Sequence, residues 1–163
     1  MLIPKKLRSQ YQILLAIQLI GTLVVVYRLI LDMFNSGFSG YLIPGMLIST
    51  FSLFAVVMGF QAKRDSFKLL VWCQILQLFF VAIGPLRWAI FLAPNLLVGA
   101  GVIDTGITFT LFDFQFNPAY LCSLEGGKGV VMFKLNVIPF IFIHFTQVIR
   151  NRAIDVHNAG LKS

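Results

Sequence analysis

Long apolar runs separated by short polar segments dominate the chain. These runs cover residues 11–34, 41–60, 66–92 and 129–149. A helix needs about 20 mainly apolar residues to cross the roughly 30 Å hydrocarbon core of a bilayer. The pattern therefore predicts an all-α membrane protein, in which the four runs form a four-transmembrane-helix bundle and residues 1–163 make a single integral membrane domain.

A fifth span over residues 86–102 is the main alternative to this arrangement. The segment is apolar, but Asn95 interrupts it and Arg87 would enter the membrane at its start. Counting it as a span would also move the basic residues after the last run to the outer side, against the positive-inside rule. We therefore favour four spans, with an outer loop over residues 93–128.

Two further features concern the runs themselves. The first run is longer than the apolar region of a signal peptide, and no small-residue cleavage site follows it, so we interpret it as an uncleaved helix.

Pro85 and Pro139 lie within the third and fourth runs, where proline removes a backbone hydrogen bond. We expect a kink at each.

Composition and charge agree with a membrane location. Hydrophobic residues make up 58% of the chain and charged residues 12%, compared with roughly 45–50% and about 25% in soluble domains. The net charge is +7, but the basic residues lie between apolar runs, which does not fit a nucleic-acid interface. Nine of them fall in segments that four spans place on one side: Lys5, Lys6, Arg8, Lys63, Arg64, Lys68, Arg150, Arg152 and Lys162.

Only Arg87 and Lys128 belong to the opposite side in this arrangement. Basic residues accumulate in cytoplasmic segments of membrane proteins. We therefore expect both termini in the cytoplasm and the chain in a plasma membrane or bacterial inner membrane.

The outer loop contains a segment with the alternation of a β-strand, from Thr105 to Phe116. The alternation changes phase between Leu111 and Phe112, as a bulge or a tight bend requires. We expect a short β element here that docks a partner protein, because an exposed run this apolar is a liability for a lone monomer. Its docking residues are Phe109, Phe112, Phe114 and Phe116. The alternative is that these rings dip into the membrane interface or cap the bundle.

Polar residues inside apolar runs are the default candidates for function. Arg28 and Asp32 are spaced to pair along one helix, and with Arg87 and Lys134 they could gather near the outer interface. The full set of intramembrane polar candidates is Gln18, Arg28, Asp32, Gln74, Gln77, Lys134 and His144. A stripe of small residues in the second run predicts close helix packing, and consists of Gly45, Ser49, Ser52 and Gly59.

Gln18, Gln74 and His144 lie at similar depth when counted from the cytoplasmic ends of their runs. We expect them to form a hydrogen-bonded cluster that holds the helices together. The alternative is a proton or ion relay centred on His144, since histidine titrates near neutral pH.

No signature of catalysis or cofactor binding is present in the sequence. It lacks a phosphate-binding loop, a nucleophile elbow and a zinc-binding helix motif. Cys73 and Cys122 have no metal-ligand spacing. We therefore expect no enzyme activity, cofactor, metal or nucleic acid. The sequence favours a multi-pass subunit that stabilises a larger complex, with the lipid bilayer and other membrane subunits, identical or different, as partners. The alternative is a small transporter or channel component.

Overall fold

The computed structural model describes residues 5–61, 63, 65–103, 106–115, 118–123 and 130–160. Over these residues, three helices come first, six strands follow, and a fourth helix comes last. Along the chain the elements are α1 (Lys5–Ser36), α2 (Leu42–Phe60), α3 (Ser66–Ile75), β1 (Phe79–Ile83), β2 (Leu86–Phe91), β3 (Asn95–Ile103), β4 (Gly106–Gln115), β5 (Ala119–Ser123), β6 (Val130–Asn136) and α4 (Ile138–Gly160).

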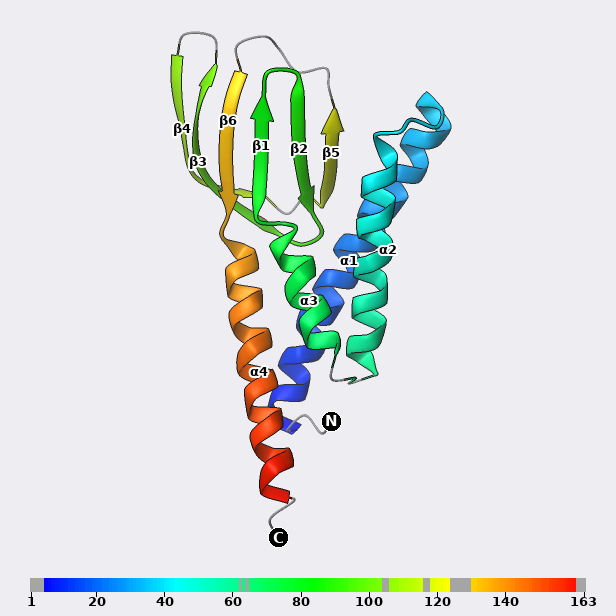
Figure 1. The fold of residues 1–163 in the computed structure, drawn as a ribbon, viewed down its shortest axis with the longest axis vertical. Coiled ribbons are helices and arrows are strands. Elements are labelled where there is room, and N and C mark those ends of the chain that lie inside the picture. Colours follow the sequence, from blue (N-terminus) through cyan, green and yellow to red (C-terminus); the bar gives the residue numbers. More distant parts are fainter. Residues whose placement is uncertain are drawn as a thin grey trace.

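The long helices α1 and α2 form an antiparallel hairpin (Figure 1). The buried face of α1 repeats at intervals of three and four residues, the spacing of one helix face, and consists of Leu7, Tyr11, Leu15, Gln18, Thr22, Val25 and Leu29. The shorter α3 packs against α2 and α4. Both termini lie at the helical end of the molecule, and the sheet lies at the other (Figure 1).

The six strands form one antiparallel sheet in the order β4-β3-β6-β1-β2-β5. A two-residue turn, Gly84-Pro85, joins β1 to β2. Gly84 has a φ of 55°, while the ring of Pro85 holds its own φ negative. This combination is that of a type II′ turn, which matches the twist of the flanking strands.

The expected four-transmembrane-helix bundle is wrong, because two of the four apolar runs contain strands of a six-stranded sheet as well as helix. The run over residues 66–92 contains helix only as far as Ile75 and then forms β1 and β2. The run over residues 129–149 begins with β6, and α4 starts at Ile138. Hydropathy cannot distinguish a helix from consecutive strands that are apolar on both faces.

Both expected proline kinks were also wrong for this reason. Pro85 lies in the turn between strands, and Pro139 is the second residue of α4, where the missing N–H has no helical partner to lose. The alternative fifth span, residues 86–102, is β2 and most of β3.

The expected outer loop, residues 93–128, contains β3, β4 and β5. The strand expected from residue 105 to 116 is confirmed over residues 106–115, which form β4. Of the expected bulge or tight bend, the structure has a bulge. Leu97 pairs with Asp113 and Gly99 with Thr110, so β4 carries one extra residue where the alternation changes phase. The sheet is nevertheless far larger than the short element that the alternation predicted.

Two helical segments are long and apolar enough to cross a membrane, Leu7–Ser36 and Leu42–Phe60. Length and composition are the basis of this finding, and a buried core helix or a signal sequence meets the same criteria. The expectation of four such helices is wrong for the described residues, because α3 has only 10 residues and α4 does not qualify.

Candidate functional site

The helices and the sheet meet where α3 leads into β1 and where β6 leads into α4. Buried amide side chains form hydrogen bonds at this junction. The Gln77 side chain donates to the carbonyl of Cys73 (2.9 Å) and accepts from the N–H of Leu92 (2.8 Å). It thereby joins the end of α3 to the segment between β2 and β3. Gln77 is fully buried, so these two bonds satisfy backbone groups that water cannot reach.

Asn136 acts in the same way at the start of α4. Its Oδ1 accepts from the N–H groups of Leu96 (3.0 Å) and Ile138 (3.3 Å). The backbone N–H of Asn136 donates to the carbonyl of Leu78 (2.7 Å). The transition from strand to helix therefore leaves few backbone groups without a partner, even though it lies inside the molecule.

A second set of polar side chains connects α1, α2 and α3. Gln74 Nε2 donates to Gln18 Oε1 (2.7 Å), and Gln18 Nε2 donates to Ser52 Oγ (2.9 Å). Thr22 Oγ1 donates to the carbonyl of Gln18 (2.7 Å) and lies 2.8 Å from Ser52 Oγ. Because the Thr22 proton is already used, the Ser52 hydroxyl donates to Thr22. The bonds form one directed chain that ties the three helices together.

His144 is not part of this cluster. Its side chain is exposed on α4 and lies edge-on to Phe145. The buried face of α4 instead carries Thr146, which with Gln18 and Gln74 lines a cavity of about 10 Å³. The structure thus brings two of the three expected residues together and supplies a threonine in place of the histidine.

Several buried polar atoms have no hydrogen-bond partner among the described residues. Asn95 is fully buried, and both of its amide atoms lack a partner. The others are Ser49 Oγ, Gln74 Oε1 and Asn136 Nδ2. Sequence reasoning treated Asn95 only as an interruption of an apolar run. An amide beside Pro94, in a run otherwise free of amides, is the signal that could have marked the junction.

The charged residues expected near the outer interface lie on different elements. Lys134 is on β6, where its Nζ sits 5.7 Å from the centre of the Phe80 ring. Arg87 is on β2. Arg28 and Asp32 are exposed on the C-terminal half of α1.

The small residues Gly45, Ser49, Ser52 and Gly59 are all buried on α2. A Cβ atom at Gly59 would lie 2.6 Å from a methyl of Leu15, and one at Gly45 would lie 2.8 Å from the Tyr120 ring. The stripe therefore lets α1 approach one end of α2 and strand β5 approach the other.

The register of the strands places almost only apolar side chains on one face of the sheet. The bulge in β4 restores the alternation, so that residues before and after it share this face. We define the apolar face by the register partners Phe79, Val81, Ile83, Leu86, Trp88, Ile90, Leu96, Val98, Ala100, Val102, Ile107, Phe109, Leu111, Phe114, Tyr120, Cys122, Val131, Phe133 and Leu135. The opposite face of β4 carries Thr108, Thr110, Asp113 and Gln115.

The hairpin of α1 and α2 covers one side of the apolar face. Ile90 is fully buried in a cluster with Val25 and Leu29 of α1. The Tyr120 hydroxyl donates to the carbonyl of Tyr41 (2.5 Å). Burial raises the pKa of this phenol above its ordinary value, and the neighbouring Cys122 adds to the increase. The hydroxyl therefore stays protonated and remains a donor through neutral pH.

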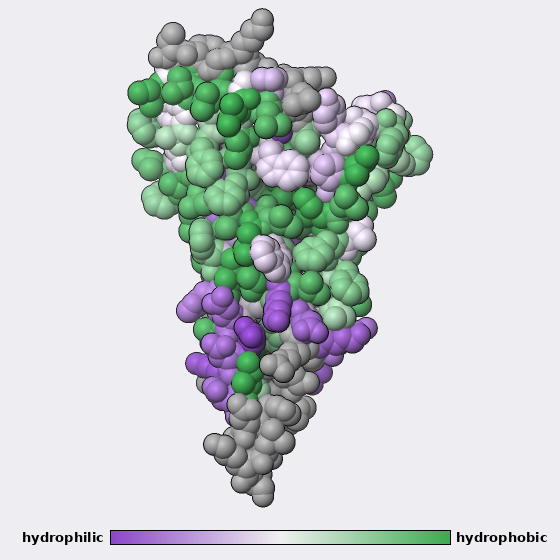
Figure 2. All heavy atoms as spheres, viewed as in Figure 1, coloured by the Kyte–Doolittle hydropathy of each residue, from purple (hydrophilic) through white to green (hydrophobic). Residues whose placement is uncertain are grey.

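No described residue covers the other side of the apolar face, over β4, β3 and β6. Phe109 and Leu111 are both 74% exposed, and Phe114 is 62% exposed. Phe112, at the bulge, is 72% exposed. Figure 2 shows hydrophobic residues gathered over this end of the molecule and over the helices beneath it. We call Ile107, Phe109, Leu111, Phe112, Phe114, Val131 and Phe133 the open apolar patch. Phe116, the fourth expected docking residue, lies outside the described residues.

Comparison with known proteins gives no relative. No family model matches the chain, and neither a curated protein nor a solved structure is similar to it. In the described part of the chain, no three His, Cys, Asp or Glu side chains are placed to hold a metal ion. Two features of the described residues bear on function: the buried amides Gln77, Asn95 and Asn136 at the junction of helices and sheet, and the open apolar patch.

Proposed function

We propose that the chain is a non-catalytic membrane subunit that joins a larger membrane protein complex through its open apolar patch. The observation that carries this proposal is the composition of the apolar face, on which register places no charged or amide side chain. Apolar patches larger than a few hundred Å² are rare on soluble monomers, and where they occur they usually mark an interface.

In this proposal α1 and α2 cross the membrane. Only 33% of the most apolar window of each helix is buried inside the protein, whereas the core helix of a soluble protein is hydrophobic all round because it is enclosed. Large apolar side chains on α1 face outward, among them Ile20, Leu23, Tyr27 and Phe34. The 19 residues of α2 rise about 28 Å, close to the thickness of the hydrocarbon core.

The distribution of charge supports a cytoplasmic position for both termini. Arg8, Lys63, Lys68 and Arg152 are exposed, and hydrophilic residues gather towards the end of the molecule that holds the termini (Figure 2). Basic residues favour the cytoplasmic side of a membrane. The sheet then lies towards the opposite side.

The lengths of the short helices set the depth of the sheet. The 10 residues of α3 rise about 15 Å, or half of the hydrocarbon core. The strands then start near the middle of the membrane, beside the outer half of α1. Backbone that is neither helix nor closed barrel is tolerated at this depth only inside protein, which gives Gln77 and Asn136 their role at the junction.

The partner in this proposal is a protein rather than lipid alone. In the described part of the chain, β4 pairs only with β3 and forms an edge of the sheet. Backbone groups along such an edge point outward without partners, and acyl chains cannot bond to them. A membrane protein that offers an apolar surface and an extended segment beside β4 satisfies both needs.

Purification of the full chain from its native membrane in mild detergent tests this proposal. We expect the unaltered chain to elute in a stoichiometric complex and the Phe109→Ser, Phe114→Ser double variant to elute as a monomer. The matched control is Thr108→Ser, Thr110→Ser, which changes the opposite face of the same strand. A stable monomer formed by the unaltered chain would contradict the proposal.

A further inference from the structure

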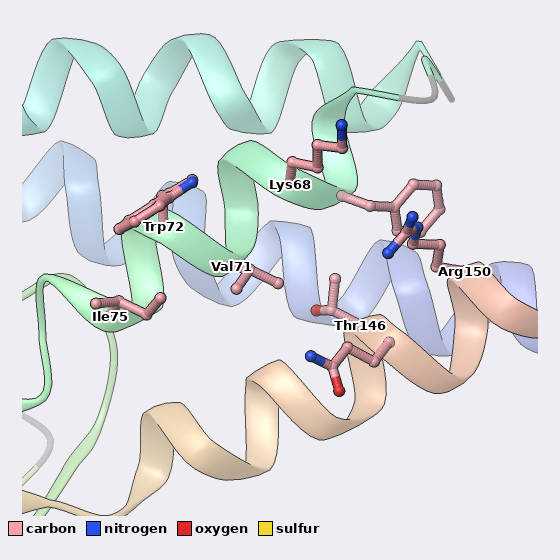
Figure 3. A pocket seen from close by; sticks show the side chains of 8 residues that line it. Lys68, Val71, Trp72, Ile75, Thr146 and Arg150 are labelled. Carbon is pink, nitrogen blue, oxygen red and sulfur yellow. The ribbon is translucent and has the colours of Figure 1, made fainter.

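A groove of about 240 Å³ runs between α3 and α4. On α3 it is lined by Phe67, Lys68, Val71, Trp72 and Ile75, which lie on one helix face at spacings of three and four residues. Figure 3 shows Lys68 at one end of the groove and Ile75 at the other. Seven residues separate them, or about 10 Å along the helix axis.

On α4, as on α3, the basic side chain lies at one end of the groove. Arg150 lies at the same end as Lys68, and Thr146 lies nearer to Val71 (Figure 3). Gln147 adds an exposed amide to this side. Among the described residues, none that lines the groove carries a carboxylate. Two cations therefore mark one end, polar uncharged groups follow, and an apolar indole and aliphatic side chains form the other end.

We propose that this groove binds one anionic phospholipid of the cytoplasmic leaflet. The phosphate lies between Lys68 and Arg150, and an acyl chain runs along Val71, Trp72 and Ile75. The Gln147 amide donates to the ester or headgroup oxygens between these two parts. This inference rests on the membrane placement given above, because the basic end must lie at the level of the headgroups and the apolar end at the level of the hydrocarbon.

Charge complementarity selects an anionic lipid over a neutral one. A basic side chain near an anionic membrane surface contributes about 1 kcal/mol, and basic pockets between helices on the cytoplasmic side bind phosphate-bearing headgroups. The apolar end selects a lipid over a free phosphate ion, which would contact only Lys68 and Arg150. Trp72 is 58% exposed, so a bound acyl chain would cover its indole ring.

Fluorescence of Trp72 offers a direct measurement. In a Trp88→Phe background Trp72 is the remaining tryptophan, and lipids with brominated acyl chains quench an indole that they contact. The full chain is reconstituted into phosphatidylcholine vesicles, into which brominated phosphatidylglycerol or brominated phosphatidylcholine is titrated. We expect the phosphatidylglycerol to occupy the site with about 30-fold higher affinity, as two basic contacts imply.

The Lys68→Gln, Arg150→Gln double variant should lose this preference. The matched control, Lys63→Gln with Arg152→Gln, removes the same charge from exposed positions outside the groove and should keep it. Equal quenching by the two lipids, equal loss in both double variants, or reversal by soluble glycerol 3-phosphate would each overturn the proposal. The Phe109→Ser, Phe114→Ser variant should retain the lipid preference, so failure of sheet-mediated assembly is distinguished from failure of this site.

Discussion

The backbone of Gly21 in α1 lies directly against the backbone carbonyl of Leu92, in the segment between β2 and β3. A Cβ atom at Gly21 would sit 1.9 Å from the carbonyl oxygen. This contact is where the hairpin of α1 and α2 meets the base of the sheet. Neither partner can move as a flexible side chain would, so the position admits glycine alone.

Gly21→Ala should therefore destabilise the protein by about 1–3 kcal/mol, the range for overpacked interiors. Thermal unfolding of the purified chain in detergent, followed by circular dichroism, measures this effect. Gly40→Ala is the matched control, because nothing lies within 4 Å of a Cβ atom at Gly40. Equal stability of the two variants would contradict the close approach of α1 to the sheet.

Gln77→Leu should destabilise the protein by about 1–3 kcal/mol through a different mechanism. The substitution leaves the buried N–H of Leu92 without an acceptor, and an unsatisfied buried donor costs that much. Thermal unfolding again measures the loss. Gln12→Leu alters an exposed glutamine on α1 and should have little effect. A Gln77 variant as stable as this control would show that the junction does not depend on its amide.

Phe112→Gly should change the thermal stability of the chain and its assembly into the complex in different ways. Phe112 has a φ of 57°, a conformation that costs a residue with a side chain roughly 1–2 kcal/mol and costs glycine little. The ring is 72% exposed, so its removal sacrifices little packing in the isolated chain. We expect equal or higher thermal stability, but a smaller fraction of the chain in the complex on gel filtration. A less stable monomer that still assembled fully would refute both expectations.

Chemical labelling of single cysteines tests the orientation. In a Cys122→Ala background, Thr108→Cys on β4 should react with a membrane-impermeant maleimide added to intact cells. Arg152→Cys on α4 should react only after the membrane is permeabilised. Cys73 is fully buried and should stay unlabelled in both. The reverse pattern at Thr108 and Arg152 would place the termini outside and contradict the positive-inside assignment.

The sequence predicted β4 well because one face of this strand is polar. Thr108, Thr110 and Asp113 alternate with apolar residues. The change of phase between Leu111 and Phe112 predicted a bulge or a tight bend, and the structure has the bulge. In β1 and β2 the pattern fails, because residues such as Ala82 and Ala89 are apolar and buried on the face opposite Val81 and Trp88. Strands that are apolar on both sides have the hydropathy of a transmembrane helix.

The candidate site was predictable only in part for a related reason. The positions of Gln18 and Gln74 along their helices correctly predicted that the two side chains meet. Position alone could not predict which side of α4 faces the other helices. That side depends on where the helix starts, and with a start at Ile138 the buried positions become Thr146, Ile149 and Ala153. His144 then points away. Gln77 bonds to the segment between β2 and β3, and Asn136 bonds to the start of β3 and the start of α4. These contacts depend on the sheet, which the helical interpretation did not contain.

Photo-crosslinking in native membranes tests the central claim most directly. A benzophenone amino acid replaces Phe109 in the open apolar patch in one variant and Thr110, on the opposite face of β4, in another. We predict that the probe at 109 gives one discrete adduct with a membrane protein, in amounts comparable to the chain itself, and that the probe at 110 gives far less. Adducts with lipid alone at 109, or equal protein adducts at both positions, would contradict assembly through the apolar face.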